Sequence, residues 1–170
     1  MREFHLWRRK PALIYPIPPA PRTAVLIPGF RRQRKIRVFA SGWCEAARRF
    51  APQSIAGTLA QIDELAHLGI SPTHAVIVLG RERDPRLTQQ DRDRLWDALH
   101  VPVFEQIIAE DCTLLAAECE AHDGLHVESP DFITGANQID ETPCGCGRPT
   151  PRLISPERVE TLRRAAAQAR

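Results

Sequence analysis

Long apolar runs are absent from this chain of 170 residues. No stretch approaches the roughly 18 apolar residues of a membrane-spanning helix, so no membrane span is expected. The first residues also lack the uninterrupted apolar core and the small-residue cleavage site of a secretory signal. The five cysteines are an odd number. Without a secretion signal they favour a reduced, cytoplasmic protein with metal-bound thiolates over a disulfide framework.

Lysine is scarce, and the charges are unevenly distributed. Residues 1–50 hold 12 basic and 2 acidic side chains, whereas residues 51–150 hold 6 and 17. The basic groups concentrate at Arg8, Arg9, Lys10, Arg31, Arg32, Arg34, Lys35 and Arg37. They could form an arm for nucleic acid or an acidic partner, a face that folds onto the acidic body, or a solvated loop. Nucleic acid is the least favoured partner, because no aromatic interleaving or reader motif accompanies the charge.

Hydrophobic periodicity predicts an α/β domain with a mostly parallel sheet and crossover helices. Strands are expected at 23–27, 36–40, 74–79 and 101–104, and helices at 43–50, 53–67 and from Thr88 onward. Thr88 is the expected N-cap of a helix that places Leu95, Trp96 and Leu99 inward. Strands that alternate with helices in this order are typical of right-handed crossover units.

The two ends of the chain and its last third differ from this pattern. Residues 1–22 are rich in proline and are expected to form a basic arm, draped on the surface or partly disordered, before an α/β body at 23–154. Short apolar segments at 113–117, 125–127 and 132–134 predict an antiparallel meander. Ser155-Pro156-Glu157 predicts the start of a C-terminal helix over 155–170.

Cysteine and histidine residues in the meander form the most informative pattern. Cys119, Cys144 and Cys146 supply three sulfurs, and a histidine would complete the four ligands of a closed tetrahedral zinc site. His126 and His122 both compete for the fourth position, and spacing does not decide between them. The alternative is that the cysteines are small buried apolar residues, since Cys-x-Cys is a weaker metal signal than Cys-x-x-Cys. Cys44 and Cys112 are expected to be ordinary thiols.

Several motifs together resemble the phenylacetate-CoA ligases and coenzyme F390 synthetases of the adenylate-forming superfamily. They are the Gly-Arg-Glu that ends the 74–79 strand, the Val-Pro-Val-Phe strand, Glu-Cys-Glu-Ala-His-Asp-Gly-Leu-His-Val, and Pro-Cys-Gly-Cys-Gly-Arg. The resemblance covers roughly residues 50–154. It implies that zinc is held by Cys119, His126, Cys144 and Cys146, with His126 preferred over His122.

The chain departs from that family where the nucleotide is handled. Ile27-Pro-Gly-Phe-Arg-Arg lacks the hydroxyls and the glycine density of the phosphate loop. The aromatic-Gly-x-Thr-Glu motif reads Ile107-Ile-Ala-Glu-Asp111, and neither lysine occupies the catalytic position. By resemblance, a vestigial pocket would lie at Gly80, Glu82, Glu110 and Asp111, beside a turn after Phe104.

These departures predict a zinc-binding, noncatalytic relative of the acyl-binding subdomain, which binds an acyl or aryl carboxylate or a partner protein. A second hypothesis is one subunit of a split acyl-CoA ligase whose nucleotide loop and lysine come from another chain. A third is a regulator that contacts nucleic acid through the basic arm.

Overall fold

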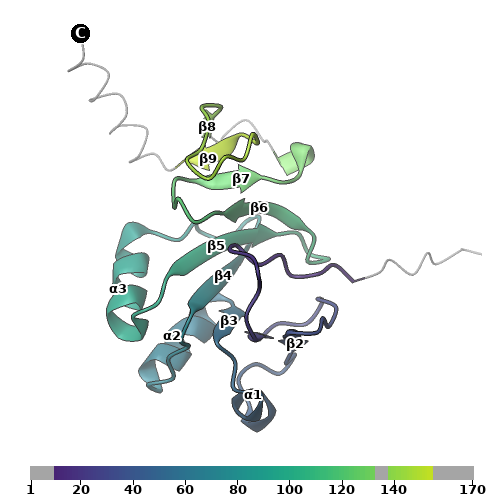
Figure 1. Cartoon of the computed structure of the whole chain (residues 1–170), viewed down its shortest axis with the longest axis vertical. Helices are drawn as coiled ribbons and strands as arrows, with labels where there is room; N and C mark the ends of the chain where they lie inside the picture. The colour runs from purple at the N-terminus through teal and green to yellow at the C-terminus, as the bar shows by residue number, and fades with distance from the viewer. Residues whose placement is uncertain (1–9, 133–137, 155–170) are drawn as a thin grey trace, which may run out of the picture.

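The computed structural model describes residues 10–132 and 138–154 of the chain. Within these residues, nine strands form one sheet in the order β2-β1-β3-β4-β5-β6-β7-β9-β8 (Figure 1). The elements are β1 (Thr23–Val25), β2 (Ile36–Val38), α1 (Glu45–Phe50), β3 (Ser54–Gly57), α2 (Leu59–His67), β4 (Ala75–Arg81), α3 (Gln89–Leu99), β5 (Val103–Ile108), β6 (Leu114–Glu118), β7 (Leu125–Val127), the 3-10 helix η1 (Pro130–Phe132), β8 (Gln138–Asp140) and β9 (Arg152–Ile154). The predicted α/β class is confirmed.

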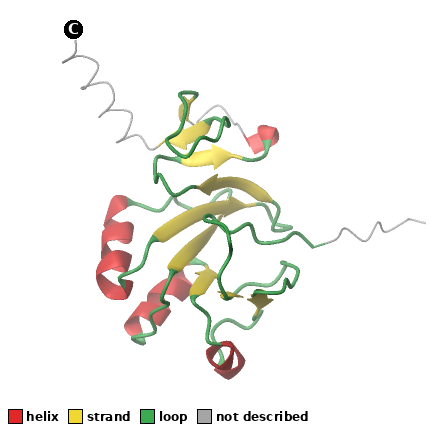
Figure 2. Ribbon diagram, in the orientation of Figure 1, coloured by secondary structure: helices red, strands yellow, loops and turns green. Residues whose placement is uncertain are grey.

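The first five strands form the parallel half of the sheet. Helices α2 and α3 cover one face of this half, as Figure 2 shows, and bury Ile62, Leu65, Leu95 and Leu99 against it. Because the five strands are parallel, their carboxyl ends lie along one edge of the sheet, where open α/β sheets place their ligands. None of the described helices is long and apolar enough to cross a bilayer.

The proline-rich N-terminal segment packs on the opposite face of the parallel half. Leu13 and Tyr15 are only 3% and 6% exposed. The Tyr15 hydroxyl lies 2.7 Å from Ser54 Oγ and 2.8 Å from His74 Nδ1, and Gln106 Nε2 donates to the backbone oxygen of Ile14 at 2.7 Å. The expectation of an arm draped on the surface or partly disordered needs correction within residues 10–22, because Leu13 and Tyr15 complete the core.

The expected helix over 53–67 is wrong at its start. Residues Ser54–Gly57 form β3, which is hydrogen-bonded in parallel to β1 and β4, and the helix begins only after Thr58. The Thr58 hydroxyl accepts from the backbone N–H of Gln61, and the Gln61 side chain accepts from the backbone N–H of Thr58. This reciprocal cap satisfies two free N–H groups and fixes the boundary.

Thr88 caps α3 in the same way through Asp91, as predicted. Leu95 and Leu99 point into the core, but Trp96 is 52% exposed, so its expected inward position is wrong. The helix turns Trp96 by about 100° from Leu95, and the apolar stripe is too narrow to include it.

The antiparallel half begins where β6 pairs with β5, and it continues through β7, β9 and β8. Strand β5 runs on to Ile108, so the expected turn after Phe104 is wrong. The expected strand at 132–134 is also wrong at Phe132, which ends η1. Residues 133–137 and the C-terminal helix expected at 155–170 lie outside the described residues, as does the first part of the basic arm.

Candidate metal centre

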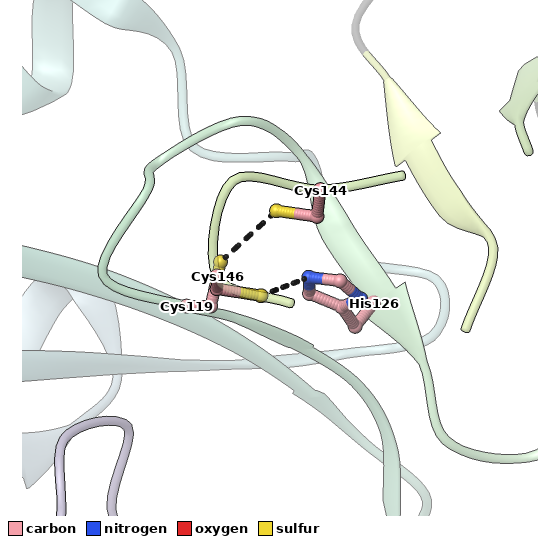
Figure 3. A group of neighbouring side chains, drawn as sticks. All are labelled: Cys119, His126, Cys144 and Cys146. Atoms are coloured by element: carbon pink, nitrogen blue, oxygen red, sulfur yellow. Dashed lines mark hydrogen bonds between the residues drawn. The ribbon is translucent and has the colours of Figure 1, made fainter. Parts of the chain in front are cut away.

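Cys119, His126, Cys144 and Cys146 come together at one end of the antiparallel half (Figure 3). One ligand atom from each residue lies within 4.8 Å of all the others. The Sγ atoms of Cys119 and Cys144 are 3.7 Å apart, and Cys146 Sγ lies 3.3 Å from His126 Nε2. Three thiols and one imidazole nitrogen can therefore hold a metal ion.

Three separate segments supply these ligands. Cys119 directly follows β6, His126 is the middle residue of β7, and both Cys144 and Cys146 lie in the connection between β8 and β9. Ala117 pairs with His126 across β6 and β7, which brings the imidazole beside the end of β6. The ligand set therefore depends on the register of the antiparallel half.

Two glycines shape the ligand loops. Gly124 has φ +89°, and a Cβ atom there would lie 2.6 Å from the backbone oxygen of Leu153. Gly147 has φ +79°, and its N–H donates to the Cys144 oxygen at 2.9 Å. The backbone N–H of Arg148 also points at Cys146 Sγ at 3.5 Å. These turns place Cys144 and Cys146 on one side of the connection.

His126 is fully buried and has its two ring nitrogens in different environments. Nδ1 lies 2.9 Å from Thr150 Oγ1 and 3.2 Å from Thr150 O, so an Nδ1–H can donate there. That tautomer leaves the lone pair of Nε2 directed at the thiols, which is the usual arrangement of a metal-bound imidazole. Burial lowers the pKa of His126 and favours its neutral form.

His122 lies outside the cluster. Its side chain is 41% exposed, and its Nδ1 lies 3.1 Å from a carboxylate oxygen of Glu118. The His122 ring stacks on Phe104 with 4.7 Å between ring centroids. Of the two histidines, only His126 belongs to the group of side chains that could hold a metal ion.

The thiols differ in their tendency to ionise. Burial raises the pKa of Cys119 to about 12. Burial also opposes ionisation of Cys144, but hydrogen bonds from the Cys146 backbone and from the Cys146 and Cys119 thiols bring its pKa below the ordinary value. A bound cation would favour the thiolate at each sulfur, since the thiolate is the metal ligand.

Arg152 holds the ligand loops together from within the sheet, and sequence reasoning missed this residue. It is 1% exposed, and its guanidinium donates to the Asp123 backbone and carboxylate oxygens, to Asp140 Oδ2 at 2.5 Å and to Thr142 Oγ1 at 3.1 Å. Its Nε has no partner among the described residues. A single arginine at the start of a short strand, between Pro151 and Leu153, gives no signal of this role in the sequence.

A second buried ionic group links β6 to α3. Glu118 and Glu105 are 3% and 4% exposed. Arg92 Nη1 donates to Glu118 Oε2 at 2.9 Å, and Arg92 Nη2 lies 3.4 Å from Glu105 Oε2. The backbone N–H of Glu105 also donates to Glu118 at 2.9 Å. The residue preceding Cys119 is thus fixed by contacts to both halves.

Gly80, Glu82, Glu110 and Asp111 lie away from the metal cluster, at the carboxyl ends of β4 and β5. Gly80 pairs with Ile107 within the sheet. Arg81 donates from Nη1 to the Ala109 backbone oxygen, and Cys112 Sγ contacts the Pro28 oxygen at 3.4 Å. Side chains therefore bridge this edge at the place expected for the vestigial pocket.

No protein-family model and no curated protein matches the chain. Among solved structures, it is similar to 2-hydroxyisobutyryl-CoA ligase in an open conformation, in complex with 2-HIB-AMP and CoA. The identity is 13%, the TM-score is 0.54, and the match covers 79% of this chain and 47% of the ligase chain. The fold is that of part of an acyl-CoA ligase. At this identity the similarity shows the fold alone, and it does not single out the phenylacetate-CoA ligases.

Proposed function

We propose that this chain is a zinc-binding, noncatalytic domain with the fold of part of an acyl-CoA ligase. The observation that carries the proposal is the four-ligand cluster. A tetrahedral zinc site has edges of about 3.8 Å between sulfurs and about 3.5 Å between sulfur and nitrogen, given its usual bond lengths. The separations of 3.7 Å and 3.3 Å lie close to these edges.

The composition of the cluster favours zinc and a structural role. Soft thiolates with one imidazole suit zinc better than they suit hard cations such as magnesium. Four protein ligands leave no open coordination position for water or substrate, which is characteristic of structural rather than catalytic zinc. Zinc here would join the end of β6, the centre of β7 and the connection between β8 and β9.

The proposed lack of adenylation rests on the residues at the end of β5. Ile107 and Ile108 are 0% and 1% exposed and pack into the core, at the place where the resemblance implies an aromatic residue and a glycine. Adenylation requires a loop whose hydroxyls and closely spaced backbone N–H groups orient a triphosphate for transfer. The segment Ile27-Pro-Gly-Phe-Arg-Arg has no hydroxyl and only one glycine, so it could attract an anion through its arginines but not orient a triphosphate in that way. The proposed role is therefore binding of an acyl or aryl carboxylate or of a partner protein.

Metal analysis and an exchange assay test this proposal together. Purified protein should contain about one zinc per chain, and it should not exchange pyrophosphate into ATP with phenylacetate or other aryl acids. Absence of stoichiometric zinc would overturn the metal assignment, and clear exchange by pure protein would overturn the noncatalytic role. Chemical-shift changes at residues 80–82 and 104–111 on adding aryl carboxylates would identify the bound class. Without any such change, a partner protein becomes the favoured ligand.

A further inference from the structure

A cleft of about 340 Å³ lies outside the metal centre, beside the ends of β1 and β2. It is lined by Lys10, Pro28, Gly29, Phe30, Arg31, Arg32, Val38 and Ala40. Pro28 and Gly29 follow the end of β1, whereas Val38 and Ala40 lie at the end of β2. Strands β1 and β2 run parallel, so the cleft lies at the carboxyl-end edge of the sheet, where open α/β sheets place ligands.

The lining combines three cations with an apolar floor. Lys10, Arg31 and Arg32 carry the charge, and the chain has no acidic residue between Glu3 and Glu45. Within the described residues, no salt bridge joins these three side chains to a carboxylate. Uncompensated cations at a concave surface attract anions and raise their local concentration.

The loop that carries the two arginines is anchored to the N-terminal segment and to the core of the parallel half. The N–H of Arg31 donates to the Pro11 oxygen at 2.9 Å, and Gln33 Nε2 donates to the Leu13 oxygen at 3.1 Å. The Phe30 side chain is 4% exposed and belongs to the core of the parallel half. Arg31 and Arg32 therefore extend from a backbone fixed by buried neighbours, which lowers the entropy lost when they bind a ligand.

We propose that this cleft binds a small phosphorylated molecule. The planar forks of Arg31 and Arg32 match the oxygens of a phosphate, and Lys10 adds a third positive charge. The apolar floor at Pro28 and Val38 suits the uncharged part of such a molecule, and the volume lies in the range of small-ligand sites. Nucleic acid fits less well, because the one aromatic side chain of the lining, Phe30, is buried and offers no face for base stacking.

Titration of inorganic pyrophosphate into the zinc-loaded full chain tests the proposal, with calorimetry at two salt concentrations. The variant Arg31→Gln with Arg32→Gln should weaken binding at least about tenfold, because hydrogen bonds to charged groups are lost. Arg34→Gln with Lys35→Gln is the matched control. It removes the same charge from the same loop but does not touch the cleft lining, so it should change binding by less than about threefold.

A third variant tests whether binding depends on the shape of the cleft as well as on its charge. Ala40→Phe keeps every cation and fills the cleft, so it should also lose pyrophosphate while circular dichroism and zinc content stay unchanged. Equal losses in the two double variants, or full binding by Ala40→Phe, would show diffuse surface attraction and overturn the proposal. Absence of pyrophosphate binding would overturn it as well, and so would displacement of pyrophosphate by a single-stranded oligonucleotide at far lower concentration. The zinc assignment is independent of each of these results.

Discussion

Strands β1 to β5 pack between two apolar layers, whereas β6 to β9 share one small apolar cluster with several buried polar groups. The parallel half contributes clusters of 13 and 11 buried residues. The antiparallel half has a cluster of six, one of which, Ile107, belongs to β5. Arg152, Glu118, Cys119, His126 and Cys144 are buried there as well, and Cys146 is half-buried beside them. Burial of apolar area can stabilise the first half, whereas the second half has a smaller apolar cluster and depends more on its polar partners and, under the proposed function, on a bound metal.

Removal of the proposed metal should cause the largest difference in amide exchange between the two halves. With Cys144→Ser and Cys146→Ser, or after chelation, amide exchange at residues 112–132 and 138–154 should rise by orders of magnitude, because metal-binding energy is folding energy when the unfolded chain has no site. Exchange in β1 to β5 should stay close to its original rate. Mass spectrometry of deuterated peptides measures both.

Cys44→Ser provides the control for these cysteine variants, since Cys44 lies before α1 and outside the cluster. It should retain zinc and leave exchange in the antiparallel half unchanged. Retention of stoichiometric metal by the double variant, or equal loosening of both halves, would contradict the comparison.

The two histidines should differ strongly in their effect on metal affinity. His126→Ala removes a ligand, and it should weaken zinc binding by more than the roughly 10–100-fold that loss of a supporting hydrogen bond costs. Thr150→Ala removes the hydroxyl partner of Nδ1 and should fall within that range. His122→Ala should retain zinc, because its ring contacts Glu118 and Phe104 instead. A competition titration with a chromogenic chelator gives all three affinities, and the reverse order would show that the histidines are wrongly assigned.

Arg152→Met should destabilise the antiparallel half by about 3–5 kcal/mol, the usual cost of breaking a buried ion pair on one side. Asp123 and Asp140 each lose a charged donor. Arg148→Gln is the matched control, because the Arg148 pair with Glu128 is about one-third exposed on both sides and should contribute less than about 1 kcal/mol. Urea unfolding, followed by signals from β7 and β9, measures the free energy of unfolding of the antiparallel half in both variants. Similar losses in the two variants would show that Arg152 has no special role.

Local signals in the sequence were enough to predict most of the parallel half. The β4 run, the Thr88 cap and the burial of Leu95 and Leu99 follow from periodicity and capping. Strand β3 was missed because Ile55 fits the helical spacing of Leu59 and Ile62, although the Thr58 cap excludes it from the helix. The burial of Leu13 and Tyr15 depends on contacts with distant strands, which periodicity does not report.

The cluster of three cysteines and one histidine was predictable in part. Spacing identified the three sulfurs, and the resemblance, not spacing, preferred His126 over His122. The register of β6 against β7 then places His126 in the cluster. Arg152 and the Glu118 to Arg92 contact were missed, because their partners lie between 10 and 29 residues away along the chain. The cleft required the folded positions of Lys10 and Val38, which lie on separate segments.

The smallest expected effect concerns Glu105, where the two halves meet. Burial raises the pKa of Glu105, despite opposing contributions from the Leu87 N–H and Arg92. The folded chain therefore binds this proton more tightly than the unfolded chain does. The contribution of Glu105 to stability is fully present below the ordinary carboxyl pKa and is lost as the pH rises through the raised folded-state pKa.

Glu105→Gln imitates the protonated form and keeps an oxygen for the Leu87 N–H. The variant should be more stable than the original protein at pH 7, by about 1 kcal/mol or less, and the difference should vanish near pH 4, where the glutamate is itself protonated. Thermal unfolding across this pH range measures the trend, with Glu110→Gln at an exposed turn as the control. A Glu105→Gln protein that is less stable than the original at pH 7 would instead show that the ion pair with Arg92 outweighs the cost of burying the charge. An ionised Glu105 carboxylate would then help to join the parallel half to β6.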